Sequence, residues 1–113
     1  MNLPSQEIIS RIEKTIKDAG FLINPATLQK SNSDPTGVLR IDIFGSESSK
    51  MLPRPIVGCM TFDEKLWKIL VCDGAYMVQI IDLHAKLTAE LRKRFELRVH
   101  ILITAPEAPL VSI

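Results

Sequence analysis

The sequence is poor in the residues that build metal centres and in aromatic side chains. It has two cysteines and two histidines in 113 residues, and no CxxC, HExxH or other metal-ligand spacing occurs. We therefore expect no metal site and no cofactor, and we interpret Cys59 and Cys72 as small buried hydrophobic residues. One Trp, one Tyr and four Phe leave few rings for stacking on nucleic-acid bases.

Long apolar runs and an excess of one charge are missing as well. No run approaches the ~20 apolar residues that cross a membrane, and the charged side chains among residues 1–20 do not fit a secretory leader. With 14 basic and 13 acidic residues, the net charge of +1 gives no overall attraction to nucleic acid or anionic lipid. We expect a cytoplasmic protein without a membrane partner, in which any nucleic-acid binding comes from a local patch.

The sequence does have enough apolar residues for one folded domain. Hydrophobic residues make up 46% of the chain and charged residues 24%, which excludes a disordered chain. A chain of this length folds as one domain and buries roughly two-thirds of the surface that the unfolded chain exposes. We assign residues 1–113 to a single domain, with a proline-containing tail over 105–113.

Hydrophobic spacing predicts two helices. Apolar residues three and four apart mark a helix between Ser5, a candidate N-cap, and Gly20, which ends it. The same spacing marks a longer helix over 75–95. The Asn24-Pro25 pair also indicates one or two helical turns over 25–30.

Alternating or continuous apolar residues predict strands. The four main strands are expected over 38–44, 56–62, 65–72 and 97–104, with a short edge strand over 21–23. The first three main strands form an antiparallel meander, and the long helix crosses over to a last strand parallel to the third. The predicted class is therefore α/β (α+β), in the order α-β-β-β-α-β, on a mixed sheet with its helices mainly on one face.

A hairpin turn at Asp63-Glu64 would sort the strand residues onto two faces of the sheet. In this register Cys59 lies opposite Lys68, and Cys72 lies about 13 Å further along the neighbouring strand, beyond disulfide range. The face without helices is apolar in the middle, with charges set into it. Its predicted binding surface consists of Arg40, Asp42, Cys59, Lys68 and Leu70.

Two interpretations of this surface do not involve catalysis. It is either a half-solvated sheet face closed by cross-strand ion pairs, such as Asp42 with Lys68, or a protein-binding surface. The second follows from the apolar patch that residues such as Leu70 would otherwise expose. Our functional hypothesis is a small intracellular, non-catalytic binding, regulatory or accessory module that contacts a protein partner or a second copy as a homodimer.

The element order also resembles that of the restriction-endonuclease-like nucleases. This resemblance implies two acidic groups that hold a divalent ion and a lysine that activates the attacking water. The residues for these roles would be Asp42, Asp63 and Lys65, although the acid-x-lysine run at 63–65 falls at the predicted turn. The alternative function is a metal-dependent nuclease or a degenerate relative that binds nucleic acid.

Two further polar features have both a structural and a functional interpretation. A basic cluster ends the long helix and continues beyond it, with members Arg92, Lys93, Arg94 and Arg98. It either stabilises the helix dipole or contacts nucleic-acid phosphates. Asp73-Gly74, before the long helix, either caps the helix or marks a site for a small anionic ligand.

Overall fold

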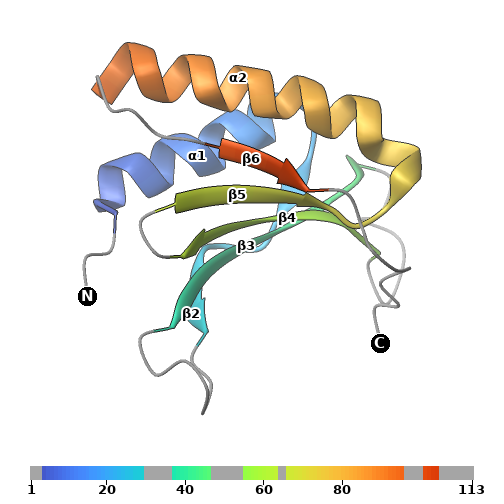
Figure 1. The fold of residues 1–113 in the computed structure, drawn as a ribbon, viewed down its shortest axis with the longest axis horizontal. Coiled ribbons are helices and arrows are strands. Elements are labelled where there is room, and N and C mark those ends of the chain that lie inside the picture. Colours follow the sequence, from blue (N-terminus) through green and yellow to red (C-terminus); the bar gives the residue numbers. More distant parts are fainter. Residues whose placement is uncertain (1–3, 30–36, 47–54, 64–65, 96–100, 105–113) are drawn as a thin grey trace.

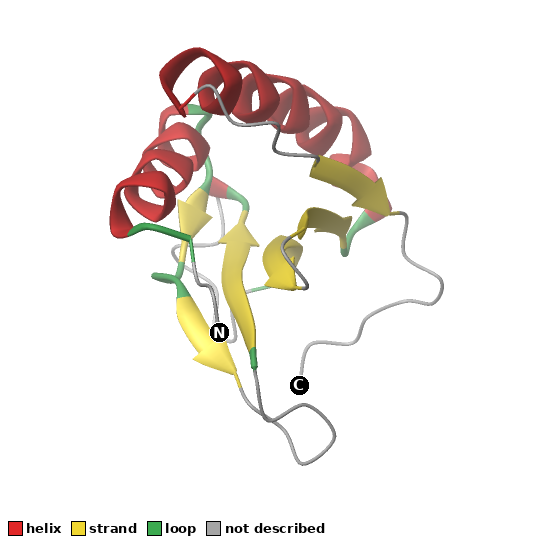
Figure 2. Cartoon of the chain, turned by 60° about the vertical axis from the view of Figure 1, so that its left-hand side comes forward, coloured by secondary structure: helices red, strands yellow, loops and turns green. Residues whose placement is uncertain are grey.

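The computed structural model describes residues 4–29, 37–46, 55–63, 66–95 and 101–104. Two helices lie over the same face of a six-stranded mixed sheet, so that the molecule has a helical layer and a sheet layer (Figures 1 and 2). The predicted α+β class and the placement of the helices on one face are confirmed.

The first helix, α1 (Gln6–Asp18), begins and ends where its sequence signals predict. The Ser5 hydroxyl accepts a hydrogen bond from the backbone N–H of Ile8 at 3.3 Å, which satisfies one of the free donors of the first turn. Gly20 follows the helix with a φ of 93°, a conformation that favours glycine. The buried side of α1 carries Ile9, Ile12 and Ile16.

The long helix, α2 (Met77–Phe95), follows a short 3₁₀ turn over Gly74–Tyr76. Its buried side carries Ile80, Leu83, Leu87 and Leu91, each of which is at most 1% exposed. Their three-and-four spacing is the period of a helix with one buried stripe. No helix in the described ranges combines the length and hydrophobicity that a membrane crossing requires.

The strands follow one another across the sheet in the order β1-β3-β4-β5-β6, and β2 also pairs with β3. Among the strands that the structure describes, β5 and β6 are the only parallel pair, because α2 crosses over between them. The strands are β1 (Leu22–Ile23), β2 (Thr27–Gln29), β3 (Val38–Phe44), β4 (Ile56–Asp63), β5 (Leu66–Val71) and β6 (Ile101–Thr104). The first half of the last predicted strand, over 97–100, lies outside the described residues.

The predicted helical turn over 25–30 is wrong, because part of that segment forms β2. Thr27 pairs with Arg40 and Leu28 with Leu39, so the segment hydrogen-bonds to the edge of β3 instead of within itself. The backbone N–H of Ala26 donates to a carboxylate oxygen of Glu13 at 3.1 Å, which ties this edge to α1. These are contacts between residues distant in sequence, and a local capping signal does not report them.

The predicted hairpin register is wrong by two residues. Asp63 remains in β4 and pairs with Leu66, so that Cys59 lies opposite Leu70 and Thr61 lies opposite Lys68. Because side chains alternate with a period of two, a two-residue shift leaves every side chain on its predicted face. The core accordingly includes Leu39, Ile41, Ile43, Met60, Trp67, Ile69 and Val71 from the helix-covered face.

Candidate functional site

The face of the sheet turned away from α1 and α2, here called the far face, carries all five residues of the predicted binding surface. Their strand partners arrange them in two adjacent rows. Arg40, Thr61 and Lys68 form one row, and Asp42, Cys59 and Leu70 form the next. The structure therefore brings the five residues together across β3, β4 and β5.

One ion pair lies within this surface. The Arg40 Nε donates to Asp42 Oδ1 at 2.6 Å, and both side chains are partly buried, at 34% and 22% exposure. This hydrogen bond, more than any other influence, raises the pKa of Arg40. The predicted pairing of Asp42 with Lys68 is wrong, because the corrected register puts these residues in different rows.

The two cysteines lie next to each other on the far face. The backbone N–H of Cys72 donates to the carbonyl of Val57 at 3.0 Å, which sets Cys72 two residues from the position opposite Cys59. The two thiols are close enough to influence each other's pKa, so the predicted separation of about 13 Å is wrong for the same reason as the register. Both cysteines are free thiols.

Burial controls the chemistry of these thiols. Desolvation raises the pKa of Cys59 to about 11, and the nearby charge of Arg40 opposes that effect only in part. Desolvation is also the main cause of the raised pKa of Cys72. Both side chains are therefore protonated near neutral pH, and this environment does not activate either of them as a nucleophile.

The residues of the nuclease alternative do not converge in the described part of the chain. Asp42 lies opposite Cys59, and Asp63 lies four residues further along β4, about 13 Å away at the rise of a strand. Lys65 lies outside the described residues. Within the described ranges, no three His, Cys, Asp or Glu side chains are placed to hold a metal ion.

The basic cluster at the end of α2 lies beside α1. Arg92, Lys93 and Arg94 are all exposed, and Arg98 lies outside the described residues. Lys93 and Arg94 line a groove of about 530 Å³ together with Arg11 and Lys14 of α1. Arg11 and Lys14 could not be assigned to the basic cluster from the sequence, because only the packing of α1 against α2 brings them to it.

Asp73, at the junction before α2, is a capping residue, which is the structural one of its two predicted roles. Its carboxylate accepts a hydrogen bond from the backbone N–H of Ala75 at 3.0 Å and so caps the 3₁₀ turn. A hollow of about 620 Å³ lies nearby, with Ala75 and Tyr76 in its lining. His84, on α2, is half-buried and its Nε2 hydrogen-bonds to the carbonyl of Ile101, joining α2 to β6.

Comparisons of this chain with protein-family models, curated proteins and solved structures found no match.

Proposed function

We propose that this protein is a non-catalytic binding module that works in the cytoplasm as a homodimer, with the far face as its interface. The observation that supports the proposal is the character of that face. Leu66 and Leu70 on β5 are partly exposed, and Leu102, which pairs with Lys68, is 50% exposed on the same side of β6. These accessible apolar side chains lie on β5 and β6, at one side of the far face, and apolar side chains that remain accessible on a sheet face are typical of protein interfaces.

The charges of the far face favour a second copy as the partner. Arg40 already neutralises Asp42, whereas Lys68 and Asp63 have no ion-pair partner among the described residues. A two-fold axis that passes between Lys68 and Asp63 would set Lys68 of each copy near Asp63 of the other. Such an interface is self-complementary, as the symmetry of a homodimer requires.

Sedimentation analysis of Leu70→Lys tests this proposal. We expect the wild-type protein to be a dimer at micromolar concentration and the variant to be a monomer, because the substitution buries an unpaired charge in the interface. Val78→Lys is the matched control, since Val78 is 77% exposed on the helical layer. This control should remain dimeric.

Two results would contradict the proposal. The first is a wild-type protein that remains monomeric at all concentrations tested. The second is a dimer that Val78→Lys weakens as much as Leu70→Lys does, because this would place the interface elsewhere. The protein could also be a monomer that forms a stable complex with another protein through the far face. This result would support a binding module but reject the homodimer.

A further inference from the structure

The groove between the two helices has a composition unlike that of the far face. The helices run antiparallel, with the end of α2 beside the first half of α1. The residues that line the groove are Glu7, Ser10, Arg11, Lys14, Lys93, Arg94 and Phe95. A second hollow of about 460 Å³ shares Arg11 and Lys93 with the first, so the two hollows are adjacent along the helices. We call the two hollows together the helix groove.

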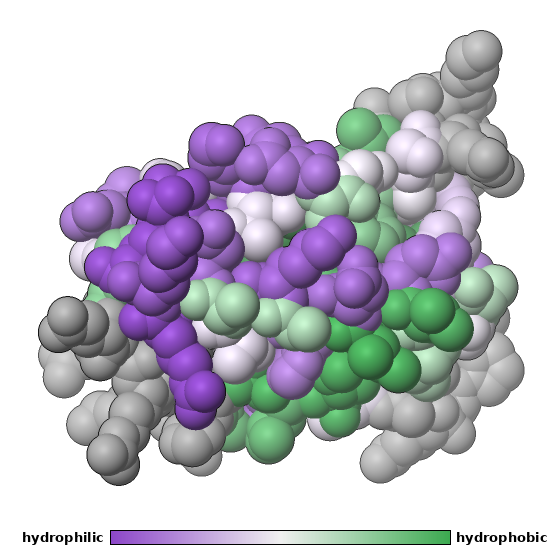
Figure 3. Space-filling view, turned by 90° about the horizontal axis from the view of Figure 1, so that it is seen from above, coloured by the Kyte–Doolittle hydropathy of each residue, from purple (hydrophilic) through white to green (hydrophobic). Residues whose placement is uncertain are grey.

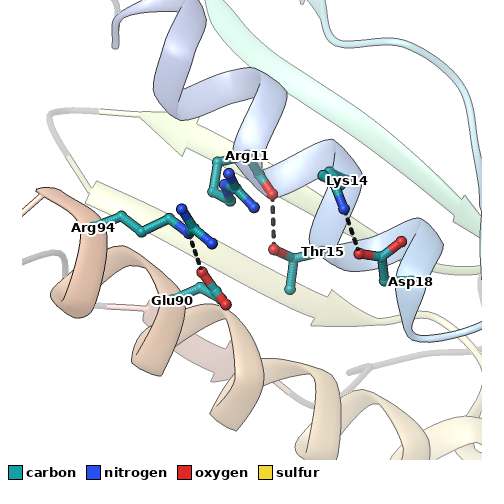
Figure 4. Close-up of polar contacts among 6 residues, drawn as sticks. All are labelled: Arg11, Lys14, Thr15, Asp18, Glu90 and Arg94. Carbon is teal, nitrogen blue, oxygen red and sulfur yellow. Dashed lines mark hydrogen bonds and ion pairs between the residues drawn. The ribbon is translucent and has the colours of Figure 1, made fainter.

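Five cations line the helix groove, and the chain itself neutralises three of them. Lys86 pairs with Asp82 at 3.1 Å. Lys14 pairs with Asp18 at 3.0 Å, and Arg94 pairs with Glu90 at 2.7 Å (Figure 4). Arg11 and Lys93 make no ion pair with any residue that the structure describes. They come from opposite walls of the groove, one from α1 and the other from α2.

The lowered pKa of Glu90 reflects the positive charges around it in the helix groove. The hydrogen bond from Arg94 lowers the pKa of this carboxyl most, and the charges of Arg94, Arg11 and Lys93 lower it further. One carboxylate thus lies in the field of three cations. A further anion placed between Arg11 and Lys93 would meet two cations that form no ion pair in the described chain, while Glu7 is the one carboxylate of the first hollow.

We propose that the helix groove binds a single strand of nucleic acid through its phosphodiester backbone. Arg11 and Lys93 would contact phosphates from the two walls, and guanidinium groups match phosphate oxygens in geometry. Phe95 packs partly against the core and also lines the groove, and an unpaired base would stack on the part of its ring that remains accessible there. A duplex keeps its bases stacked inside, so the ring favours a single strand.

The arrangement of the helical layer argues against an anionic membrane as the ligand. Membrane-surface helices combine cations with adjacent apolar side chains that enter the lipid. Here the large exposed apolar residues of α2, Val78 and Ile81, lie near its start, whereas Lys93 lies near its end, about 18 to 22 Å away along the helix. Viewed onto the helices, hydrophobic residues gather at one side and hydrophilic residues cover most of the remainder (Figure 3).

Fluorescence anisotropy with a labelled oligothymidine strand tests the proposal. The informative variant is Arg11→Gln with Lys93→Gln, and its control is Lys17→Gln with Arg92→Gln, which removes the same charge from residues outside the groove lining. We expect the groove variant to lose about tenfold or more in affinity and its log–log salt slope to fall by about 1.4, as for two lost phosphate contacts. The control should change the affinity by less than about twofold.

The ring of Phe95 gives a separate test. Phe95→Leu should weaken binding about fivefold or more without changing the salt slope, because it removes stacking and leaves the charges in place. Circular dichroism should show wild-type helix content in every variant. If Arg11→Gln disturbs the fold, two single variants at exposed neighbouring residues replace it. Lys93→Gln then removes a groove cation, and Arg92→Gln is its control outside the groove lining.

Three results would overturn the proposal. They are a wild-type protein that does not bind the strand at 50 mM salt, equal losses in the groove variant and its control, and tighter binding to phosphatidylserine vesicles than to the strand. The last result would assign the cations to a lipid surface. Neither outcome of the dimer test bears on this comparison, because the helix groove and the far face lie on opposite layers.

Discussion

Gly58 lies on β4 where α2 packs closely against the sheet, and its replacement tests this packing. A Cβ atom built on Gly58 would lie 2.9 Å from the carbonyl oxygen of Leu70 and 3.1 Å from Cδ1 of Ile80. The carbonyl belongs to the backbone of the neighbouring strand, and Ile80 is fully buried. Neither neighbour can move without disturbing the strand pairing or the core.

We expect Gly58→Ala to destabilise the fold. Overpacking of this kind costs about 1 to 3 kcal/mol, while alanine regains about 0.5 to 1 kcal/mol because it has less conformational freedom to lose than glycine. The free energy of unfolding should therefore fall by up to about 2.5 kcal/mol, with a midpoint of about 1.2 kcal/mol, which corresponds to roughly 5 °C in Tm for a domain of this size. Urea denaturation followed by circular dichroism measures the difference.

Gly74→Ala is the matched control, because a Cβ there has no neighbour within 4 Å and the φ of Gly74 is not in the left-handed region. This variant should be as stable as the wild type or slightly more stable. Gly20→Ala also has open space, but a φ of 93° should make it less stable by about 1 kcal/mol. If Gly58→Ala were as stable as Gly74→Ala, the close approach of α2 to β4 would be refuted.

Two further predictions concern the core and the thiols. Leu87→Ala should lower the free energy of unfolding by about 2 to 5 kcal/mol, because the fully buried side chain leaves a cavity. Lys86→Ala should cost at most about 0.5 kcal/mol, because it removes only an exposed ion pair with Asp82. If urea denaturation showed equal losses for the two variants, the assignment of Leu87 to the buried side of α2 and of Lys86 to its exposed side would be wrong. Cys59 should resist a thiol reagent at pH 8, because its raised pKa leaves little thiolate, and Cys72 should react first. Mass spectrometry would contradict this if Cys59 reacted as fast in the native protein as in urea.

The helices could be predicted from the sequence because their signals are local. The buried residues of α1 and α2 recur every three or four positions, and Ser5 and Gly20 mark the ends of α1 within a few residues of the buried stripe. The strand faces were equally predictable, since the alternation of Arg40 and Asp42 with Leu39 and Ile41 does not depend on the hairpin.

Register and long-range pairing could not be predicted in the same way. The run Asp63-Glu64-Lys65 is polar throughout, so a two-residue turn fits at either of two positions, and only the ladder between β4 and β5 decides. The adjacency of the two thiols follows from that decision, and so does the placement of Lys68 in a different row from Asp42. The helix groove was hidden for a related reason, since Arg11 and Lys93 are far apart in sequence and meet only through the packing of α1 on α2.

The two proposed surfaces can be tested independently because they lie on opposite layers of the fold. Leu70→Lys changes the far face, so it should produce a monomer that retains the groove and binds a short strand with unchanged intrinsic affinity. The variant of Arg11 and Lys93 changes only the helical layer, so it should remain a dimer. If the far face does form the dimer, the two grooves would point outward on opposite sides, and one short strand would occupy one groove at a time. A strand long enough to reach both would then bind the dimer more tightly than the monomer, by effective concentration and without any new contact.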